Sequence, residues 1–228
     1  MIYTDICEGK FLSRPNRFIA QINIDNTIVI AHVKNTGRCK ELLVPGVKVV
    51  LQKSDNPERK TLYDLVAVWK NNQLINIDSQ VPNMVFLEYL QSGRYIEGIT
   101  FVKSEVKYGM SRFDFYVEAG ARKIFIEVKG VTLEEDGVAM FPDAPTERGV
   151  KHLNELIKCT KNGYEAHVAF VIQMSNVRYF TPNNKTHPAF GEALVAAKKA
   201  GVNIIALVCV VTKNTLEIEK TVPIKLTE

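Results

Sequence analysis

The stretch SRFDFYVEAGARKIFIEVKGVTL, residues 111–133, is the strongest indication of the fold of the second half of the chain. It is typical of two short strands around a turn at Gly120–Ala121. A hairpin centred on that turn pairs Glu118 with Lys123 and places Asp114 directly across from Glu127. One face of this hairpin is then entirely apolar, formed by Phe113, Phe115, Val117, Ile124, Ile126 and Val128.

The opposed carboxylates of Asp114 and Glu127 need a physical reason. Directly opposed residues have Cβ atoms roughly 4.5–5.5 Å apart, and like charges at that distance are destabilising. A divalent cation held between the two carboxylates would remove the repulsion, and Mg²⁺ is commonly bound in this way. Lys129 lies on the same face, two residues further along, where an ammonium group could contact a phosphate. The alternative is a solvated hairpin face with one unfavourable charge pair.

Composition limits the classes of protein that the chain can belong to. Its 228 residues suit one large or two small domains, and 46% hydrophobic residues provide a core. The net charge of +4 permits a polyanionic partner without demanding one. The four cysteines show no CxxC spacing, and neither a signal peptide nor a membrane-spanning run is apparent. We therefore expect a cytoplasmic protein with free thiols and no membrane partner.

Residues 1–80 are predicted to form a small N-terminal β-barrel. Five β-rich segments separated by turn residues suit a closed barrel such as an OB-fold. Basic residues are in excess over this part. Phe11 and Phe18 beside them are candidate stacking groups for bases, although burial in the core is the favoured interpretation for both. The candidate phosphate-facing residues are Arg14, Arg17, Lys34, Arg38 and Lys40. Ordinary solubilising charge is the alternative interpretation of these cations.

Residues 81–228 are predicted to form a second domain with the order α-β-β-β-α-β. A helix over 82–90 precedes the strand FVKSEVKY and the hairpin already described, and a polar loop follows the hairpin. The next helix is expected over 147–161, with Thr146 as its N-cap. A strand, a helix ending before Gly201, a buried strand and an edge strand complete the chain.

Further site candidates surround the hairpin in the sequence. If Gly109–Met110 is a turn, Glu105 pairs with Asp114, whereas a turn that includes Ser111 would shift this register. One polar side of the helix from Glu147 is expected to carry Arg148, Lys151, His152 and Glu155. Asp143 lies in the turn-rich segment FPDAPTERG and is a candidate supporting residue. The alternatives are a solvent-facing charged stripe for the helix and a turn residue for Asp143.

Together these segments resemble a known family. Asp114 followed by Glu127-x-Lys129 on an αβββαβ core is similar to the PD-(D/E)xK nuclease superfamily. The longer strings NTGR (35–38), SRFDF, FIEVKGVTL and FPDAPTERGVKHL resemble the sugar fermentation stimulation protein A family over nearly the whole chain. The resemblance implies an α/β fold in two α+β domains, an OB-fold barrel followed by a restriction-endonuclease-like domain with a mixed sheet. It also implies DNA binding without sequence specificity.

By this resemblance Asp114 and Glu127 match the metal-binding acids, and Lys129 matches the transition-state lysine. The predicted function is therefore DNA binding with a Mg²⁺-dependent phosphodiesterase site, in which the Val128 carbonyl assists the two acids and Mn²⁺ can substitute. The alternative is a non-catalytic DNA-binding regulator linked to sugar (maltose) metabolism. RNA stays open as a partner, and the sequence does not decide the oligomeric state. The sequence contains no Ser-His-Asp order, P-loop or GxGxxG motif.

Overall fold

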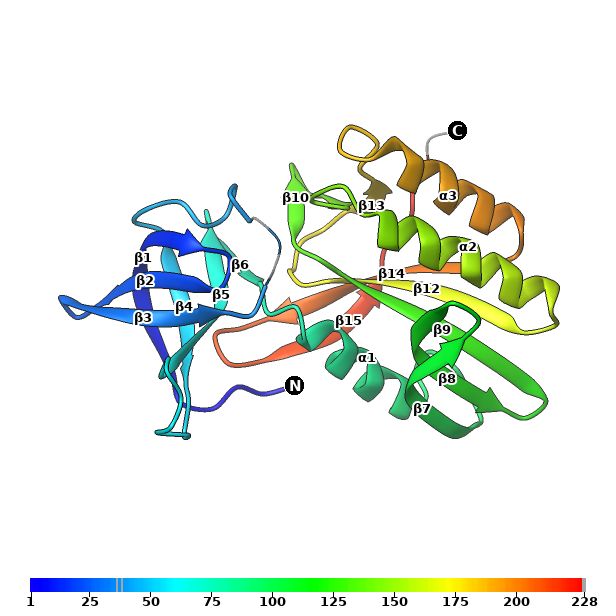
Figure 1. Ribbon diagram of the computed structural model, residues 1–228, viewed down its shortest axis with the longest axis horizontal. Helices are drawn as coiled ribbons and strands as arrows, with labels where there is room; N and C mark the ends of the chain where they lie inside the picture. Colours follow the sequence, from blue (N-terminus) through cyan, green and yellow to red (C-terminus); the bar gives the residue numbers. More distant parts are fainter. Residues whose placement is uncertain (36, 38, 227–228) are drawn as a thin grey trace.

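The computed structural model describes residues 1–35, 37 and 39–226. The first unit is a β-barrel with the strand order β3-β2-β1-β4-β5-β6, closed by parallel pairing of β3 with β5 (Figure 1). This closure confirms the predicted OB-like barrel. Its strands are β1 (Ile6–Asn16), β2 (Ile19–Ile24), β3 (Thr27–Val33), β4 (Lys48–Lys53), β5 (Tyr63–Lys70) and β6 (Gln73–Asn76).

The second unit is built on a mixed six-stranded sheet with the order β15-β14-β12-β9-β8-β7. The central pairs β9–β12 and β12–β14 are parallel, and the outer pairs are antiparallel. Helix α1 (Val81–Gln91) covers one face, while α2 (Glu147–Lys161) and α3 (Pro188–Lys199) cover the other (Figure 1). The strands are β7 (Ile99–Tyr108), β8 (Ser111–Ala119), β9 (Arg122–Val131), β12 (Glu165–Ile172), β14 (Asn203–Val211) and β15 (Leu216–Thr221).

Most of the expected elements form where they were predicted, including the αβββαβ order. Thr146 caps α2, because its hydroxyl accepts a hydrogen bond from the Gly149 N–H at 3.1 Å.

Two expectations about the secondary structure are wrong. Strand β1 was missed because its sequence, ICEGKFLSRPN, lacks apolar alternation. The expected polar loop contains β10 (Leu133–Glu135) and β11 (Val138–Phe141), which form a small sheet with β13 (Tyr179–Pro182).

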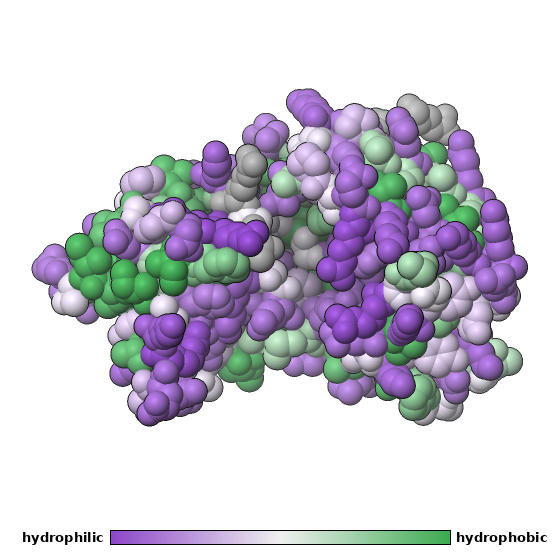
Figure 2. All heavy atoms as spheres, in the orientation of Figure 1, coloured by the Kyte–Doolittle hydropathy of each residue, from purple (hydrophilic) through white to green (hydrophobic). Residues whose placement is uncertain are grey.

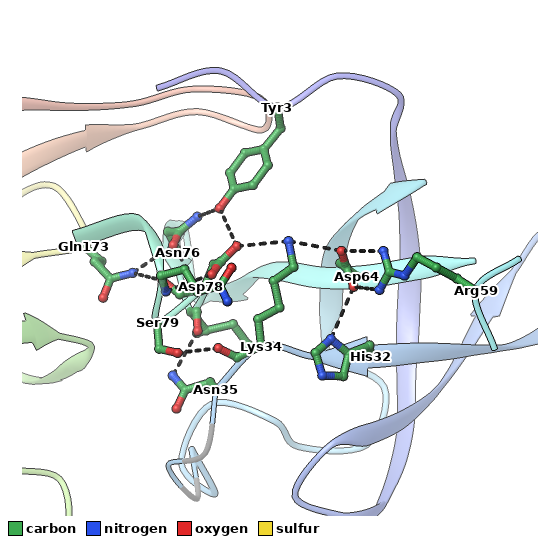
Figure 3. Close-up of polar contacts among 12 residues, drawn as sticks. Tyr3, His32, Lys34, Asn35, Arg59, Asp64, Asn76, Asp78, Ser79 and Gln173 are labelled. Carbon is green, nitrogen blue, oxygen red and sulfur yellow. Dashed lines mark hydrogen bonds and ion pairs between the residues drawn. The ribbon is translucent and has the colours of Figure 1, made fainter. Parts of the chain in front are cut away.

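A buried polar network joins the barrel to the second sheet (Figure 3). Lys34, at the end of β3, lies between two buried carboxylates, with its Nζ 3.0 Å from Asp64 and 3.6 Å from Asp78. The Gln173 amide donates to Asn76 Oδ1 at 2.8 Å and to the Asp78 carbonyl at 3.0 Å. The connection from β6 into α1 is therefore held from both units.

Gly130 allows this network to lie close to the hairpin. A Cβ atom at Gly130 would lie 2.6 Å from Gln173 Oε1 and 2.7 Å from Pro82 Cγ. Only glycine therefore allows β9 to pass so near Gln173 and the start of α1. Because Gly130 directly follows Lys129, the network and α1 together fix the position of this part of β9.

The opposite end of the sheet carries a separate ion pair. Arg122 donates to both carboxylate oxygens of Glu165, at 2.8 and 2.7 Å. Arg122, together with a bond from His167, holds the pKa of Glu165 at about 2 against partial burial.

In the described part of the chain, no helix is long and apolar enough to cross a membrane.

Replacing Arg122 with glutamine is expected to lower the free energy of unfolding by about 1 kcal/mol at pH 7, a modest value because the pair is partly exposed. A carboxyl group with a depressed folded pKa stabilises the protein above its unfolded pKa near 4.5, and this contribution is lost as the pH falls through about 2. The difference between the proteins should therefore shrink from pH 6 to pH 3 in urea titrations. An unchanged difference over this range would contradict the assignment, and Arg122→Lys serves as the charge-matched control.

Candidate active site

Strands β8 and β9 diverge at Asp114. The ladder follows the predicted register from Ala119–Arg122 to Phe115–Ile126, which is its last pair. Beyond it, the Val128 N–H donates to Asp114 Oδ2 at 2.7 Å, so a side chain replaces the backbone partner. Asp114 therefore lies where predicted in the register, in the gap between the strands rather than in a regular opposed pair.

The side chains of β8 also stop alternating regularly at this point, which the sequence did not predict. Phe113 packs toward α2, against Phe125 and His152, whereas Phe115 packs against Phe86 of α1. The expectation that Phe113 and Phe115 share one apolar face is therefore wrong. At this distortion the Asp114 carboxylate faces the Val128 N–H of the neighbouring strand.

Helix α1 supplies a second bond to Asp114. The Asn83 side-chain amide donates to Asp114 Oδ1 at 2.9 Å. Burial and the nearby charge of Glu127 raise the pKa of Asp114, and the bonds from Val128 and Asn83 oppose the shift. Asn83 was missed in the sequence because nothing in its local pattern distinguishes it from an exposed helix residue.

Glu127 is buried, at 3% exposure, and is bound on one side only. Its Oε1 accepts from Lys129 Nζ at 2.5 Å and also contacts His152 Nδ1. Its Oε2 is buried without a hydrogen-bond partner among the described residues. Burial alone would raise the pKa of Glu127, but the bonds from His152 and Lys129 outweigh it and hold the pKa below its ordinary value. The two acids thus have environments that shift their pKa values in opposite directions.

The predicted polar side of α2 is only partly exposed. His152 and Glu155 are buried at 5% each, so the alternative interpretation of a solvent-facing stripe is wrong for these two residues. His152 reaches Glu127, and Arg148 Nε lies 3.4 Å from His152 Nε2. Lys151 donates instead to the Met110 carbonyl at 3.0 Å, which ties α2 to the β7–β8 turn.

Glu105 lies outside the site. The turn at Gly109–Met110 forms as expected, with Tyr108 paired to Ser111. However, Glu105 has a φ of 55°, which interrupts the alternation of the strand, and its carboxylate lies 3.6 Å from Arg112. Glu105 therefore keeps its predicted register position opposite Asp114, between the pairs Ser104–Phe115 and Val106–Phe113, but its carboxylate is directed to Arg112.

Asp143 faces the barrel. It is exposed, and a Cβ atom placed on Gly37 would lie 2.8 Å from its Oδ2. Asp143 therefore packs beside the loop that follows β3, and the structure gives it no contact with Asp114 or Glu127 among the described residues.

The basic residues of the barrel have different roles. Arg14 donates to the carbonyls of Gly37 and Asn35 at 2.9 and 2.7 Å, so it supports a loop. Lys34 is held between carboxylates and is not a free phosphate contact. Arg17 is exposed and lies 4.8 Å from the ring of Phe18, itself 43% exposed instead of buried. Lys40 is exposed, and Arg38 lies outside the described residues.

The donors around Asp114 fit a hard divalent cation. Glu127 Oε2 is a buried oxygen without a hydrogen-bond partner among the described residues, and the charge of Glu127 acts on the nearby carboxyl group of Asp114. The carbonyl of Val128 points to the same side as its N–H, which faces Asp114, because both groups of a strand residue share one edge. No cluster of three or more His, Cys, Asp or Glu side chains suited to a metal occurs in the described part. The donors from Asp114, Glu127 and Val128 therefore suit Mg²⁺, which keeps several waters, better than an ion that is enclosed entirely by protein ligands.

Replacing Asn83 with alanine is expected to weaken divalent-metal binding roughly 10–100-fold, because a residue that bonds to a metal ligand fixes its orientation. Calorimetric titration with Mg²⁺ measures the change. Met84→Ala is the control, since Met84 is its exposed neighbour on the same helix. Equal affinity in wild type and Asn83→Ala would contradict a positioning role.

The barrel, the mixed αβββαβ sheet and the Asp-Glu-x-Lys site define a class of protein in which an OB-fold domain precedes a restriction-endonuclease-like domain. Two family descriptions match the chain: the SfsA N-terminal OB domain over residues 12–77, and the sugar fermentation stimulation protein RE domain over residues 80–215. The chain therefore belongs to the sugar fermentation stimulation protein (SfsA) family.

Similar proteins cover the whole chain. The sugar fermentation stimulation protein homolog of Desulfitobacterium hafniense strain Y51 is 61% identical over 228 residues, all of both chains. The homolog of Ruminiclostridium cellulolyticum is 57% identical, covering 99% of this chain and 100% of its own. The structure of Pyrococcus furiosus SfsA in complex with Ca²⁺ has a TM-score of 0.90 at 30% identity, covering 99% and 98% of the two chains.

Proposed function

We propose that this protein binds nucleic acid, with DNA as its main partner, and carries a Mg²⁺-dependent phosphodiesterase site formed by Asp114, Glu127 and Lys129. Two observations at the gap between β8 and β9 carry the proposal: Asp114 is near enough to Glu127 for their charges to interact, and Glu127 Oε2 has no hydrogen-bond partner among the described residues. The Ca²⁺ complex of the Pyrococcus furiosus protein supports a divalent cation in this fold.

The residues of the site have separate roles in this reaction. Asp114, Glu127 and the Val128 carbonyl would hold Mg²⁺, or Mn²⁺ in its place. Bound there, the ion supplies a Lewis acid for a phosphate oxygen and lowers the pKa of a bound water. Lys129, now on Glu127 Oε1, provides a positive charge beside the reacting phosphate. Asn83 and His152 orient the two carboxylates.

The barrel provides a surface on which a nucleic-acid strand can lie. Exposed apolar side chains gather over β2 and β3, at the left of Figure 2. Phe18, Ile28 and Ile30 are 43%, 64% and 43% exposed, with Arg17 over the Phe18 ring. Aromatic stacking beside cations is how single strands are bound without sequence preference. Among the described residues, Arg17 and Lys40 are the predicted phosphate contacts that are exposed. The four cysteines are free thiols, in keeping with a cytoplasmic location.

A non-catalytic DNA-binding regulator is the second candidate, and one observation favours it. Lys129 and His152 already compensate the charge of Glu127 at its Oε1 without a metal. Such a site can remain stable in a protein that only binds DNA. Calorimetry with Mg²⁺ separates the two candidates, because a protein that only binds DNA does not need Mg²⁺ binding that depends on Asp114.

Cleavage of single- and double-stranded DNA and of RNA, with Mg²⁺ or Mn²⁺, tests the proposal. We expect wild type to cut and Lys129→Ala to lose activity while it retains DNA binding. Equal cleavage by wild type, Asp114→Ala and Lys129→Ala would show that another nuclease is present and would remove the assignment. Competition between labelled DNA and RNA decides which polymer is preferred.

A further inference from the structure

Four side chains form a row across the outer face of the barrel, away from the carboxylates. Lys10 of β1 pairs with Asn23 of β2 on one side and with Lys48 of β4 on the other. Val49 of β4 pairs with Val68 of β5, which places Lys48 of β4 beside Trp69 of β5. Because adjacent strands lie roughly 4.7–4.9 Å apart, the row is about 14 Å long.

The two lysines at the centre of the row repel each other. Lys10 and Lys48 are directly opposed, and like charges in that arrangement are destabilising. Both are exposed, and neither forms an ion pair with any residue that the structure describes. Glu8, the nearest acid on the same strand, is bound by Lys213 at 2.8 Å. Asp25 also lines this surface. An anion between the two ammonium groups would remove the repulsion.

The row lies in a groove with unsatisfied polar groups at both ends. Two adjoining hollows of about 350 and 670 Å³ share Glu8 and Lys48 in their walls. Asn23 Oδ1 and Trp69 Nε1 are buried without a hydrogen-bond partner among the described residues. Such groups are rare in folded proteins and call for an explanation. The larger hollow lies where the barrel meets the β14–β15 turn, a typical position for a ligand site.

We propose that this row binds a nucleotide unit, with its base against Trp69 and its phosphate between Lys48 and Lys10. An aromatic side chain accepts the face of any base, and adjacent ammonium groups suit a phosphate. A neutral sugar would leave the lysines uncompensated. The unit can come from a free nucleotide or from a nucleic-acid strand. The site uses neither a metal nor Asp114 and Glu127, so it stands independently of the phosphodiesterase proposal.

The fluorescence of Trp69 tests the proposal, because it is the only tryptophan in the chain. The full protein is titrated in EDTA with adenosine monophosphate, with a short oligothymidylate and with inorganic phosphate. We expect a saturable change with one or both nucleotide ligands, and at least tenfold weaker binding in Lys10→Gln and Lys48→Gln. Lys53→Gln is the control, since it removes another exposed lysine from β4.

The outcomes are distinct. Saturation by the mononucleotide identifies a free nucleotide as a source, and saturation by the oligonucleotide alone identifies a strand. No saturable change with either, unchanged affinity in both variants, or equal affinity for inorganic phosphate would overturn the proposal. Lys10→Gln and Lys48→Gln relieve a repulsion, so their melting temperatures should equal or exceed that of wild type, which separates weaker binding from unfolding. Asp114→Asn should retain the full response.

Discussion

Replacing Asp114 with asparagine is expected to weaken Mg²⁺ binding by at least about 100-fold, beyond the roughly 10–100-fold cost of losing a residue that only supports a ligand. The change removes one of the two carboxylates at the gap between β8 and β9 but keeps the shape of the side chain. The asparagine carbonyl can still accept the bond from the Val128 N–H. The fold should therefore survive, and metal-dependent cleavage should be lost together with metal binding.

Calorimetry with Mg²⁺ and a cleavage assay on one preparation measure both effects. Glu105→Gln is the matched control, because this acid of the adjacent strand is exposed and pairs with Arg112. It should bind Mg²⁺ as wild type does. If Asp114→Asn and Glu105→Gln lose affinity to the same degree, the metal is held by general surface charge.

Replacing Lys34 with methionine is expected to lower the free energy of unfolding by about 3 kcal/mol, the low end for breaking a buried pair. Asp64 and Asp78 are 4% and 2% exposed, and the change removes the cation between them. Arg59 remains on Asp64 at 2.6 Å, which limits the loss there, while Asp78 loses its cation. Urea titration at pH 7 measures the difference.

Lys40→Met is the control for this prediction, since Lys40 is exposed and its loss should change the free energy by less than about 0.5 kcal/mol. Adding Asp78→Asn to Lys34→Met should recover part of the stability, because it removes the uncompensated charge. Strictly additive losses in the double variant would show that Lys34 and Asp78 do not interact.

The hairpin register was predictable because Gly120–Ala121 and the apolar alternation around it agree. The pairing of Glu118 with Lys123 and the approach of Asp114 to Glu127 follow from that agreement. The helix from Glu147 was predictable for a similar reason, because its cap and its apolar spacing coincide. Local patterns of this kind determine local structure.

Features that depend on distant contacts were not predictable. Phe113 turns toward α2 because a layer formed by residues far along the chain packs there. His152 lies buried against Glu127 of β9, although its position in the sequence resembles a solvent-facing stripe. Lys34 carries the charge expected of a phosphate contact but neutralises Asp64 and Asp78 at the junction. In each case the partner determines the role of the residue, and the partner lies far away in the sequence.

An anomalous difference map from crystals of the wild-type protein soaked in Mn²⁺ tests the metal site directly. We expect a peak between the Asp114 carboxylate and Glu127 Oε2, with the Val128 carbonyl as a further ligand. The same soak of Asp114→Asn crystals should show no peak there. A wild-type map with no peak at this position, or with the ion bound only elsewhere, would contradict the metal site and the phosphodiesterase function that depends on it.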